Sequence, residues 1–199
     1  VFTRYYDSAN TLSGPFGPGW VHSYGMKLVR PDSSTQDIVL ITKEGRGDRF
    51  THSGGNYTAP SAVSTTLVKN VDGTYRATEK DQAYMTFDET GRLLKVGDRY
   101  GNESVMSYST NGQLATISDP AGRGVLTLTY NSSTGRLTQV SDWMGRNVGY
   151  GYDSNNRLST VTDRVSSVTT YGYSGTTSLM TTVTDARSNV VVTNTYDAQ

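Results

Sequence analysis

Apolar and polar residues alternate strictly along several stretches of the chain, and each of these stretches ends in an aromatic residue. Residues 126–130 read Leu-Thr-Leu-Thr-Tyr, and residues 148–152 read Val-Gly-Tyr-Gly-Tyr. Because successive side chains of a strand point to opposite faces, this pattern places every second residue on one face of a sheet. The pattern therefore predicts strands in which the last aromatic residue shares a face with the residues two and four positions before it.

The aromatic residue recurs roughly every 22 residues, which marks an internal repeat. It occupies six positions: Phe87, Tyr108, Tyr130, Tyr152, Tyr173 and Tyr196. An apolar residue follows each of the first five, at Leu93, Leu114, Leu137, Leu158 and Met180. An aspartate completes each copy, at Asp98, Asp119, Asp142, Asp163 and Asp185. We therefore interpret residues 84–199 as about five copies of one repeat.

Each copy contains two turn signals. The first is rich in Asp and Asn, which bond to their own backbone, and carries Gly91 or Gly135 where a positive φ is needed. Asn156 takes that place in the fourth copy, because Asn is the next best left-handed residue.

The second turn begins at the repeated aspartate. It ends in glycine in three copies: Gly101, Gly122 and Gly145. In the last two copies Ser166 and Ser188 stand there. Since a Cβ disfavours a positive φ, we expect those two turns to be reshaped or looser.

The strand after the first turn is less regular. Leu137 and Val140 are three residues apart, which would place them on opposite faces of a regular strand. Either one of them lies at a bend or the strand carries a bulge.

One repeat thus corresponds to one hairpin, and consecutive hairpins are expected to pair edge to edge. About ten strands would result, a width at which sheets usually curl or close. We predict an all-β fold of stacked antiparallel β-hairpins that form a curved sheet.

The composition agrees with this fold class. Ile, Leu, Val and Phe make up about a fifth of the residues, below the usual share for a packed globule, whereas the chain has 14 Tyr and 21 Gly. The absence of cysteine excludes a disulfide scaffold. A thin wall around a lumen satisfies a low apolar content better than a thick core does.

Residues 1–83 do not follow the repeat, and we predict that they form a β module that caps the first edge of the sheet. Alternation over residues 20–28 predicts one strand, and residues 38–41 predict a strand that is covered on both sides. Asp72-Gly73 predicts a two-residue hairpin turn, and residues 53–65 resemble a loop.

Two segments resemble a known family. Residues 130–146, the clearest copy of the repeat, resemble the YD (tyrosine–aspartate) repeat of Rhs proteins. Residues 2–24 resemble the segment that introduces such repeats, with Gly17, Pro18, Gly19 and Trp20 as its most distinctive part.

The resemblance implies that the chain is the N-terminal part of a hollow β-shell, or cocoon. In bacterial members of that family the shell encloses a C-terminal toxin. The resemblance also implies that the partners are further repeats and a cargo domain of the same polypeptide, that the shell has no enzymatic activity, and that the protein is secreted or at the cell surface. We interpret the chain as a segment of a longer protein.

No group of residues indicates a catalytic site, a cofactor or a metal site. Only two histidines occur, and His22 shares a predicted strand face with Trp20, which favours packing. Residues 119–123 (Asp-Pro-Ala-Gly-Arg) resemble the family's self-cleaving site, but their place in the repeat favours an ordinary turn. The integrin tripeptide Arg46-Gly47-Asp48 is short enough to occur by chance.

The tyrosine column has two interpretations. In the first, equivalent rings of neighbouring hairpins form a ladder that braces the wall. In the second, they form an aromatic platform for carbohydrate or cell wall, as in glucan-binding repeats of similar length. Because those modules are rich in Trp and the repeats here contain only Trp143, we favour the ladder.

Charge and hydropathy limit the other partners. The 18 basic and 18 acidic residues cancel, which argues against a nucleic-acid surface. No apolar run is long enough for a membrane span. The last predicted strand, near residues 190–192, has no following hairpin, so we expect self-association through this open sheet edge.

Overall fold

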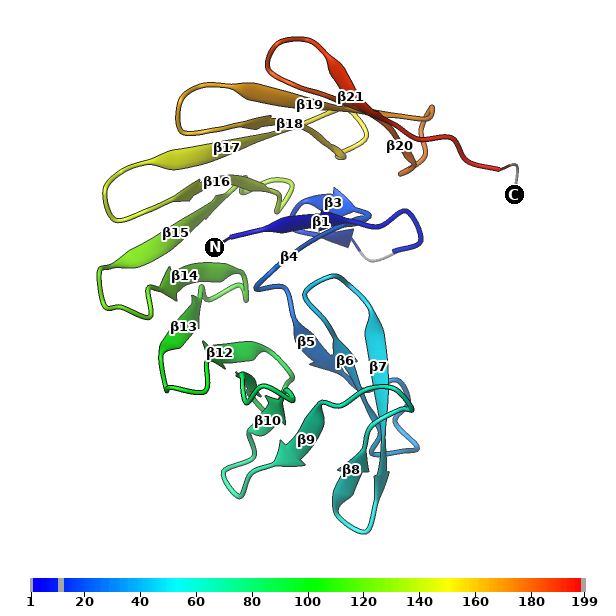
Figure 1. Ribbon diagram of the computed structural model, residues 1–199, viewed down its shortest axis with the longest axis vertical. Coiled ribbons are helices and arrows are strands. Elements are labelled where there is room, and N and C mark those ends of the chain that lie inside the picture. The colour runs from blue at the N-terminus through cyan, green and yellow to red at the C-terminus, as the bar shows by residue number, and fades with distance from the viewer. Residues whose placement is uncertain (1, 11–12, 198–199) are drawn as a thin grey trace. The chain divides into compact units, whose positions relative to one another are not determined.

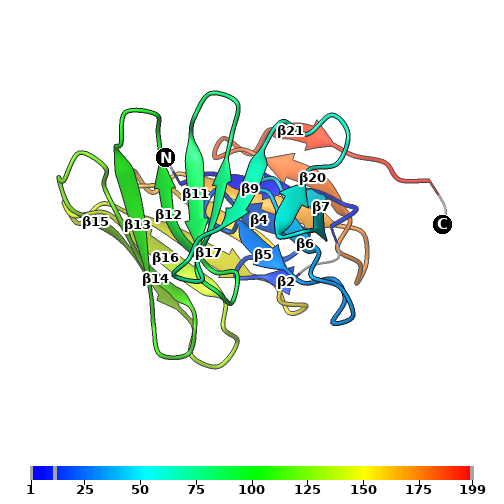
Figure 2. The same cartoon turned by 90° about the horizontal axis from the view of Figure 1, so that it is seen from below.

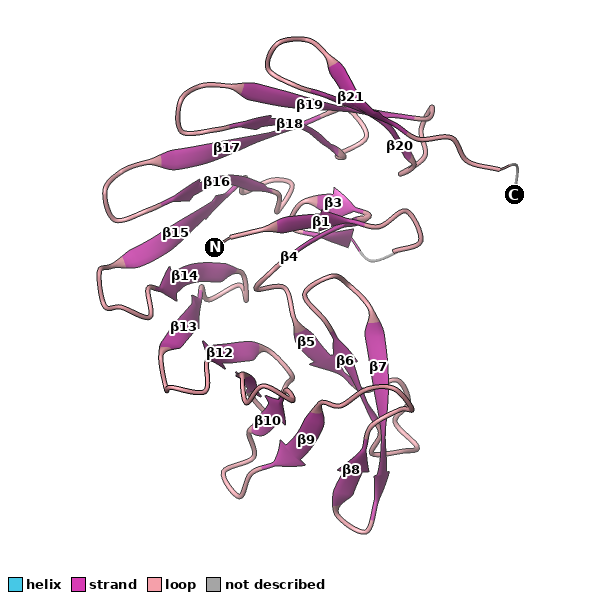
Figure 3. Cartoon of the chain, in the orientation of Figure 1, coloured by secondary structure: helices cyan, strands magenta, loops and turns pink. Residues whose placement is uncertain are grey.

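The computed structural model describes residues 2–10 and 13–197, which form two compact units. The first unit consists of Val1–Tyr5 and His22–Val125, and the second of Tyr6–Val21 and Leu126–Gln199. Every regular element in the described ranges is a strand (Figure 3). The predicted all-β fold is therefore confirmed.

Three hairpins follow one another in the first unit. Their strands are β9 (Thr66–Lys69), β10 (Tyr75–Thr78), β11 (Tyr84–Phe87), β12 (Leu93–Gly97), β13 (Glu103–Tyr108) and β14 (Leu114–Ser118). Each strand pairs antiparallel with the next, in sequence order. Figure 2 shows β11, β12 and β13 side by side. The predicted edge-to-edge pairing of hairpins is thus confirmed within this unit.

The first unit also contains a second sheet. Its strands lie in the order β5 (Lys27–Val29), β6 (Ile38–Ile41), β7 (Gly47–Ser53) and β8 (Asn56–Thr58). Ile38 and Leu40 of β6 are buried, whereas Val39 and Ile41 are half-buried, so β6 is fully covered on one face only. The strand expected over residues 38–41 is confirmed. The expectation that both of its faces are covered is wrong.

The repeats of the second unit continue the same pattern. The strands are β15 (Val125–Tyr130), β16 (Leu137–Ser141), β17 (Asn147–Tyr152), β18 (Leu158–Thr162), β19 (Val168–Tyr173), β20 (Met180–Thr184) and β21 (Val190–Thr193). They pair antiparallel in sequence order (Figure 1). The short strands β2 (Ser13–Gly14) and β3 (Gly17–Pro18) pair with each other in the same unit.

The single strand predicted over residues 20–28 is wrong. The strand β4 (Trp20–His22), which pairs with β1 (Arg4–Tyr6), ends at His22. The Gly25 N–H donates to the His22 carbonyl at 2.7 Å, which closes a turn before β5. A Cβ at Gly25 would lie 3.1 Å from that carbonyl oxygen, so glycine permits the turn. The alternation still marks the buried residues Trp20, His22, Met26 and Leu28.

Two glycine turns differ from the expectation. Residues 53–65 are not all loop, because Gly54 and Gly55 (φ 56° and 83°) form a tight turn that pairs β8 with the end of β7. The hairpin at Asp72-Gly73 is confirmed, but its loop has three residues. It is closed by the Asn70 N–H, which donates to the Thr74 carbonyl at 2.8 Å.

A bulge resolves the spacing of Leu137 and Val140. Tyr130 pairs with Leu137 and Thr129 with Gln139, so Thr138 is the extra residue. Both Leu137 and Val140 are consequently buried. The same shift precedes the aromatic landmark in four other copies. The bulge is therefore part of the repeat.

The second turns that end in serine keep the shape of those that end in glycine. Ser166 and Ser188 both adopt φ 65°, and each N–H donates to the carbonyl of the repeated aspartate at 3.0 Å. The prediction that these turns are reshaped is wrong. The aspartate side chains supply the reason, since each accepts two further backbone N–H groups. Asn156, at φ 57°, is left-handed as predicted.

Candidate functional site

Within each unit, hydroxyl groups of the tyrosine column bond to the neighbouring hairpin. In four copies the hydroxyl donates to the carbonyl of the apolar landmark of the preceding copy. The bonds run from Tyr108 to Leu93 (2.7 Å), Tyr152 to Leu137 (2.6 Å), Tyr173 to Leu158 (2.7 Å) and Tyr196 to Met180 (2.8 Å). The column is thus a ladder of O–H···O=C bonds across the sheet. Phe87, which has no hydroxyl, is buried at the end of β11, and Tyr130 ends β15.

The apolar landmarks lie beneath this ladder. Leu93, Leu137 and Leu158 have no exposed surface, and Leu114 and Met180 are also buried. Each is the first residue of its strand, directly at the bulge. The carbonyls of Leu93, Leu137, Leu158 and Met180 accept the tyrosine hydroxyls, while all five side chains fill the interior.

Burial keeps the tyrosine hydroxyls protonated. Desolvation raises the pKa of Tyr108 and of Tyr173 to about 12, and it also raises the pKa of Tyr152. Since an unperturbed tyrosine titrates near 10, these groups remain hydrogen-bond donors across the physiological range.

The repeated aspartates fold their own turns. The Asp142 carboxylate accepts the N–H groups of Met144 (2.9 Å) and Arg146 (3.0 Å). The same two bonds, to the second and fourth following residues, occur at Asp98, Asp119, Asp163 and Asp185. These carboxylates therefore satisfy backbone donors of the turn.

Ionic partners add to these turns. The Arg146 side chain, which donates to Asp142, lowers the pKa of that carboxyl, and the Arg123 guanidinium lowers the pKa of Asp119 to about 2. As in the other second turns, the Gly122 N–H donates to the Asp119 carbonyl, at 2.9 Å, but the Asp119 N–H donates to the Gly124 carbonyl, so this turn is one residue longer than the other four. Residues 119–123 form an ordinary turn, as expected.

The turn glycines have left-handed backbones. Gly91, Gly101, Gly122, Gly135 and Gly145 all have φ between 69° and 89°. Gly91 is also required by space, because a Cβ there would overlap the Leu28 carbonyl oxygen.

The two charged residues of the integrin tripeptide bond to each other. The Arg46 guanidinium donates two bonds to the Asp48 carboxylate, at 2.8 and 2.7 Å. Asp48 lies in β7 with only 7% of its surface exposed. The carboxylate that an integrin would have to reach is therefore covered.

The introductory motif packs on the tyrosine column of the second unit. We call residues 13–20 the strap. Trp20 is buried, its indole N–H donates to the Tyr173 hydroxyl at 2.9 Å, and its ring meets Tyr171 edge-on with centroids 4.9 Å apart. Gly17 and Pro18 form β3, and Gly19 follows at φ 77°.

The tip of the strap inserts between repeat residues. Phe16 has no exposed surface and contacts Tyr150, with ring centroids 4.8 Å apart. The Pro15 carbonyl accepts from the Leu137 N–H at 2.9 Å and lies 3.2 Å from the Tyr152 hydroxyl.

The local sequence does not identify this arrangement. Two large aromatic residues that flank Gly-Pro-Gly were an available signal, because such side chains are seldom left exposed. Which surface buries them depends on residues more than a hundred positions later, and no local pattern identifies it.

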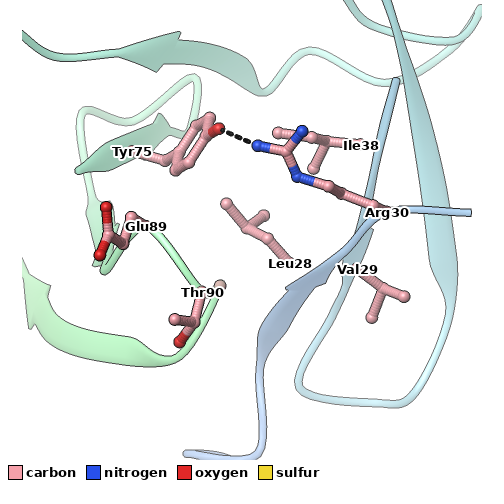
Figure 4. A pocket seen from close by; sticks show the side chains of 8 residues that line it. Leu28, Val29, Arg30, Ile38, Tyr75, Glu89 and Thr90 are labelled. Carbon is pink, nitrogen blue, oxygen red and sulfur yellow. Dashed lines mark hydrogen bonds between the residues drawn. The ribbon is translucent and has the colours of Figure 1, made fainter. Parts of the chain in front are cut away.

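In the first unit a pocket of about 350 Å³ lies beside Tyr75 (Figure 4). Arg30 donates to the Tyr75 hydroxyl at 3.1 Å, and Leu28 and Ile38 supply apolar lining. Glu89 belongs to the turn between β11 and β12. The pocket thus combines a cation, a carboxylate and an apolar floor.

His22 is a packing residue in the first unit. It is buried and stacked on Phe2, with ring centroids 5.0 Å apart. Burial lowers its pKa to about 4, so the ring is neutral near pH 7.

Within residues 2–10 and 13–197, no three His, Cys, Asp or Glu side chains come together as a metal site. No helix in this part of the chain is long and apolar enough to cross a membrane.

Comparison with protein families identifies the repeats. Residues 69–199 match the teneurin YD-shell family. The chain belongs to the YD-shell family. Residues 1–50 match a separate domain of unknown function, DUF6531. The resemblance to YD-repeat proteins is confirmed.

Curated relatives of this YD-shell chain are much longer. It is 31% identical over 114 residues to the tRNA3(Ser)-specific nuclease WapA of Bacillus spizizenii, which is 56% of this chain and 5% of that protein. The tRNA nuclease WapA of Bacillus subtilis strain 168 is 31% identical over the same length, with the same coverage. The chain therefore spans about a twentieth of the relatives that it matches.

Proposed function

We propose that the chain is a non-enzymatic part of a shell wall that encloses a C-terminal toxin or other cargo polypeptide. One observation carries the proposal. Consecutive hairpins pair in sequence order, and in four copies the tyrosine hydroxyl donates a hydrogen bond to a carbonyl of the preceding copy. Such a unit can be repeated without limit, because each copy bonds only to its neighbours.

The length of the relatives supports the proposal. The matched stretch is 5% of each WapA protein, so most of those chains lies outside it. We assign the nuclease activity in their names to that remainder. In the YD-shell chain the repeated tyrosines and aspartates hold backbone groups, which is a structural role.

The end of the second unit is suited to continuation. Val190 and Val191 of β21 are each 57% exposed, and among the described strands only β20 pairs with β21. We propose that a further repeat of the same polypeptide covers this edge. In a 199-residue fragment the same edge would mediate self-association.

The location follows from the same proposal. A wall that protects a delivered cargo acts outside the producing cell, so we propose that the protein is secreted or displayed at the cell surface.

Protease protection in the full-length protein tests the wall. We expect the C-terminal region to survive a protease in the wild type and to be degraded in a Leu137→Ala/Leu158→Ala variant, because both side chains are buried under the tyrosine ladder. Val165→Ala, at a residue 70% exposed, is the control and should leave protection unchanged. Equal degradation of the C-terminal region in the folded wild type would refute encapsulation.

A tyrosine variant addresses the carbohydrate-binding alternative. Tyr108→Ala should lower the melting temperature, since the Tyr108 hydroxyl bonds to Leu93. If the wild type is instead retained on cell-wall glycan and Tyr108→Ala loses that retention at an unchanged melting temperature, the chain is a binding module.

A further inference from the structure

The strap is itself a small hairpin. Ser13 pairs with Pro18 and Gly14 with Gly17, so Pro15 and Phe16 form its tip. The tip presents one carbonyl and one large ring to the repeats of the second unit. The tip of this compact element is complementary to the surface of the repeats on which it packs.

The bulges of the repeats supply the backbone donors of that surface. Leu137 is the first residue of β16, and its N–H donates to the Pro15 carbonyl. Met180 is the first residue of β20, and its N–H donates to the Tyr6 hydroxyl at 2.8 Å. Leu137 and Met180 hold the same position in two copies of the repeat. Two residues of the N-terminal segment, Pro15 and Tyr6, therefore accept hydrogen bonds from equivalent backbone amides at two bulges.

Side chains of the repeats add specificity. Arg136 donates to the Gly14 carbonyl at 2.7 Å and to the Ser13 hydroxyl at 3.2 Å. The Tyr6 hydroxyl donates to the Ser178 carbonyl at 2.7 Å, and its ring lies 5.3 Å from that of Trp20. Burial raises the pKa of Tyr6, so this hydroxyl stays protonated.

Close backbone contact selects glycine in the strap. A Cβ on Gly17 would lie 2.7 Å from the Asn156 carbonyl oxygen, and Gly17 also has φ 94°. A larger residue would lift the strap from the repeats. This surface thus fits a segment in which two aromatic side chains are separated by Gly-Pro-Gly.

We propose that the aromatic face of the second unit is a binding surface for an extended polypeptide in which two aromatic side chains flank a glycine-rich turn. The strap, together with Tyr6, is its resident ligand and holds the hairpins from β16 to β20 as one body. This assigns a role to part of the segment that matches a domain of unknown function.

Hydrogen exchange at the two bulge amides tests whether the strap is bound in this way. In the full 199-residue chain, Tyr6→Phe removes the hydroxyl that accepts from Met180 and keeps the ring. We expect the Met180 amide to exchange about tenfold faster, the change that corresponds to one lost hydrogen bond. The Leu137 amide should change less.

Phe16→Ala removes the tip anchor. We expect faster exchange at both Leu137 and Met180, with the ladder amides of β17 and β18 unchanged. Phe50→Ala is the matched control, because Phe50 is an equally buried ring of the first unit. It should leave both bulge amides protected.

Reconstitution in trans tests the binding surface. A synthetic peptide of residues 13–21, added at roughly millimolar concentration to replace the effective concentration of the attached strap, should restore protection of Leu137 in the Phe16→Ala chain. The same peptide with alanine in place of Phe16 should not. Unchanged exchange at Leu137 and Met180 in folded Phe16→Ala, or equal rescue by the two peptides, would overturn the proposal.

Discussion

The two units cover the same kind of hairpin in different ways. In the first unit the buried residues come from two sheets, with Leu28, Ile38 and Phe50 on one and Tyr75 and Phe87 on the other. The Leu28 N–H donates to the Gly91 carbonyl at 2.9 Å, which ties the two sheets. In the second unit a strap of eight residues covers the tyrosine column through hydrogen bonds and two aromatic rings.

This difference shows that the repeat does not prescribe what covers it. A second sheet stabilises the hairpins by burying apolar side chains, and this interaction does not depend on the direction of particular bonds. A strap stabilises through directed bonds and close backbone contact, and therefore depends on particular atoms. The two units should consequently respond to different substitutions.

The largest effect is expected from Phe50→Ala. Removing a fully buried phenylalanine leaves a cavity and should lower the unfolding free energy of the first unit by about 3–5 kcal/mol. Urea titration followed by hydrogen exchange would assign the loss to first-unit amides. Thr51→Ala, at the exposed next residue of β7, should cost less than about 0.5 kcal/mol. An equal loss in both units would mean that they do not have separate cores.

Gly17→Ala should be the strongest single-atom perturbation of the second unit. Gly112→Ala is its control, since Gly112 has φ 81° but nothing within 4 Å of a built Cβ. The control should cost about 1 kcal/mol from backbone strain alone, and Gly17→Ala about 2–3 kcal/mol because the clash with Asn156 is added. Equal costs in thermal unfolding would show that close approach is unimportant.

Removing a ladder hydroxyl should affect both units alike. Tyr108→Phe and Tyr152→Phe each lose one donated proton, so each should cost about 1 kcal/mol in chemical denaturation. Tyr100→Phe, at a tyrosine that is 75% exposed, should have no measurable effect. A loss confined to Tyr152→Phe would show that only the strap, and not the ladder, uses the hydroxyls.

Ser166→Gly should stabilise the second unit by about 0.5–1 kcal/mol, because it relieves a positive φ that Gly145 adopts without strain. Differential scanning calorimetry would detect the rise in melting temperature. Ser154→Gly is the control. Because Ser154 lies in a turn but has no positive φ itself, this substitution should not raise the melting temperature. No gain at Ser166 would mean that the serine hydroxyl compensates for its backbone.

The smallest effect is expected from pH. The pKa of Asp119 is lowered to about 2 from its usual value near 3.9, so its stabilising contribution is complete above pH 4 and is lost as pH falls towards 2. Melting temperatures between pH 2 and 5 should fall less steeply for Asp119→Asn than for the wild type. Identical slopes would show that its bond to Arg123 does not affect stability.

The candidate site was predictable only where its geometry is local. The turn at Asp119, the left-handed Asn156 and the aromatic column follow from residues within one repeat, because Asp, Asn and Gly shape their own backbone. The structural role assigned to the repeat positions stays a prediction. The domain boundary between residues 83 and 84 also stays a prediction. The serine turns were predicted wrongly, since side-chain bonds from Asp163 and Asp185 outweigh the strain.

The amino-acid sequence by itself determined that this chain is a series of hairpins and which residues turn inward, because strand alternation and turn chemistry act over a few residues. The tertiary structure alone decided that the tyrosine hydroxyls reach carbonyls of the preceding copy and that residues 13–20 lie on the column. Those contacts join residues 15 to more than 150 positions apart, and their energy depends on atoms that meet only after the sheet has formed.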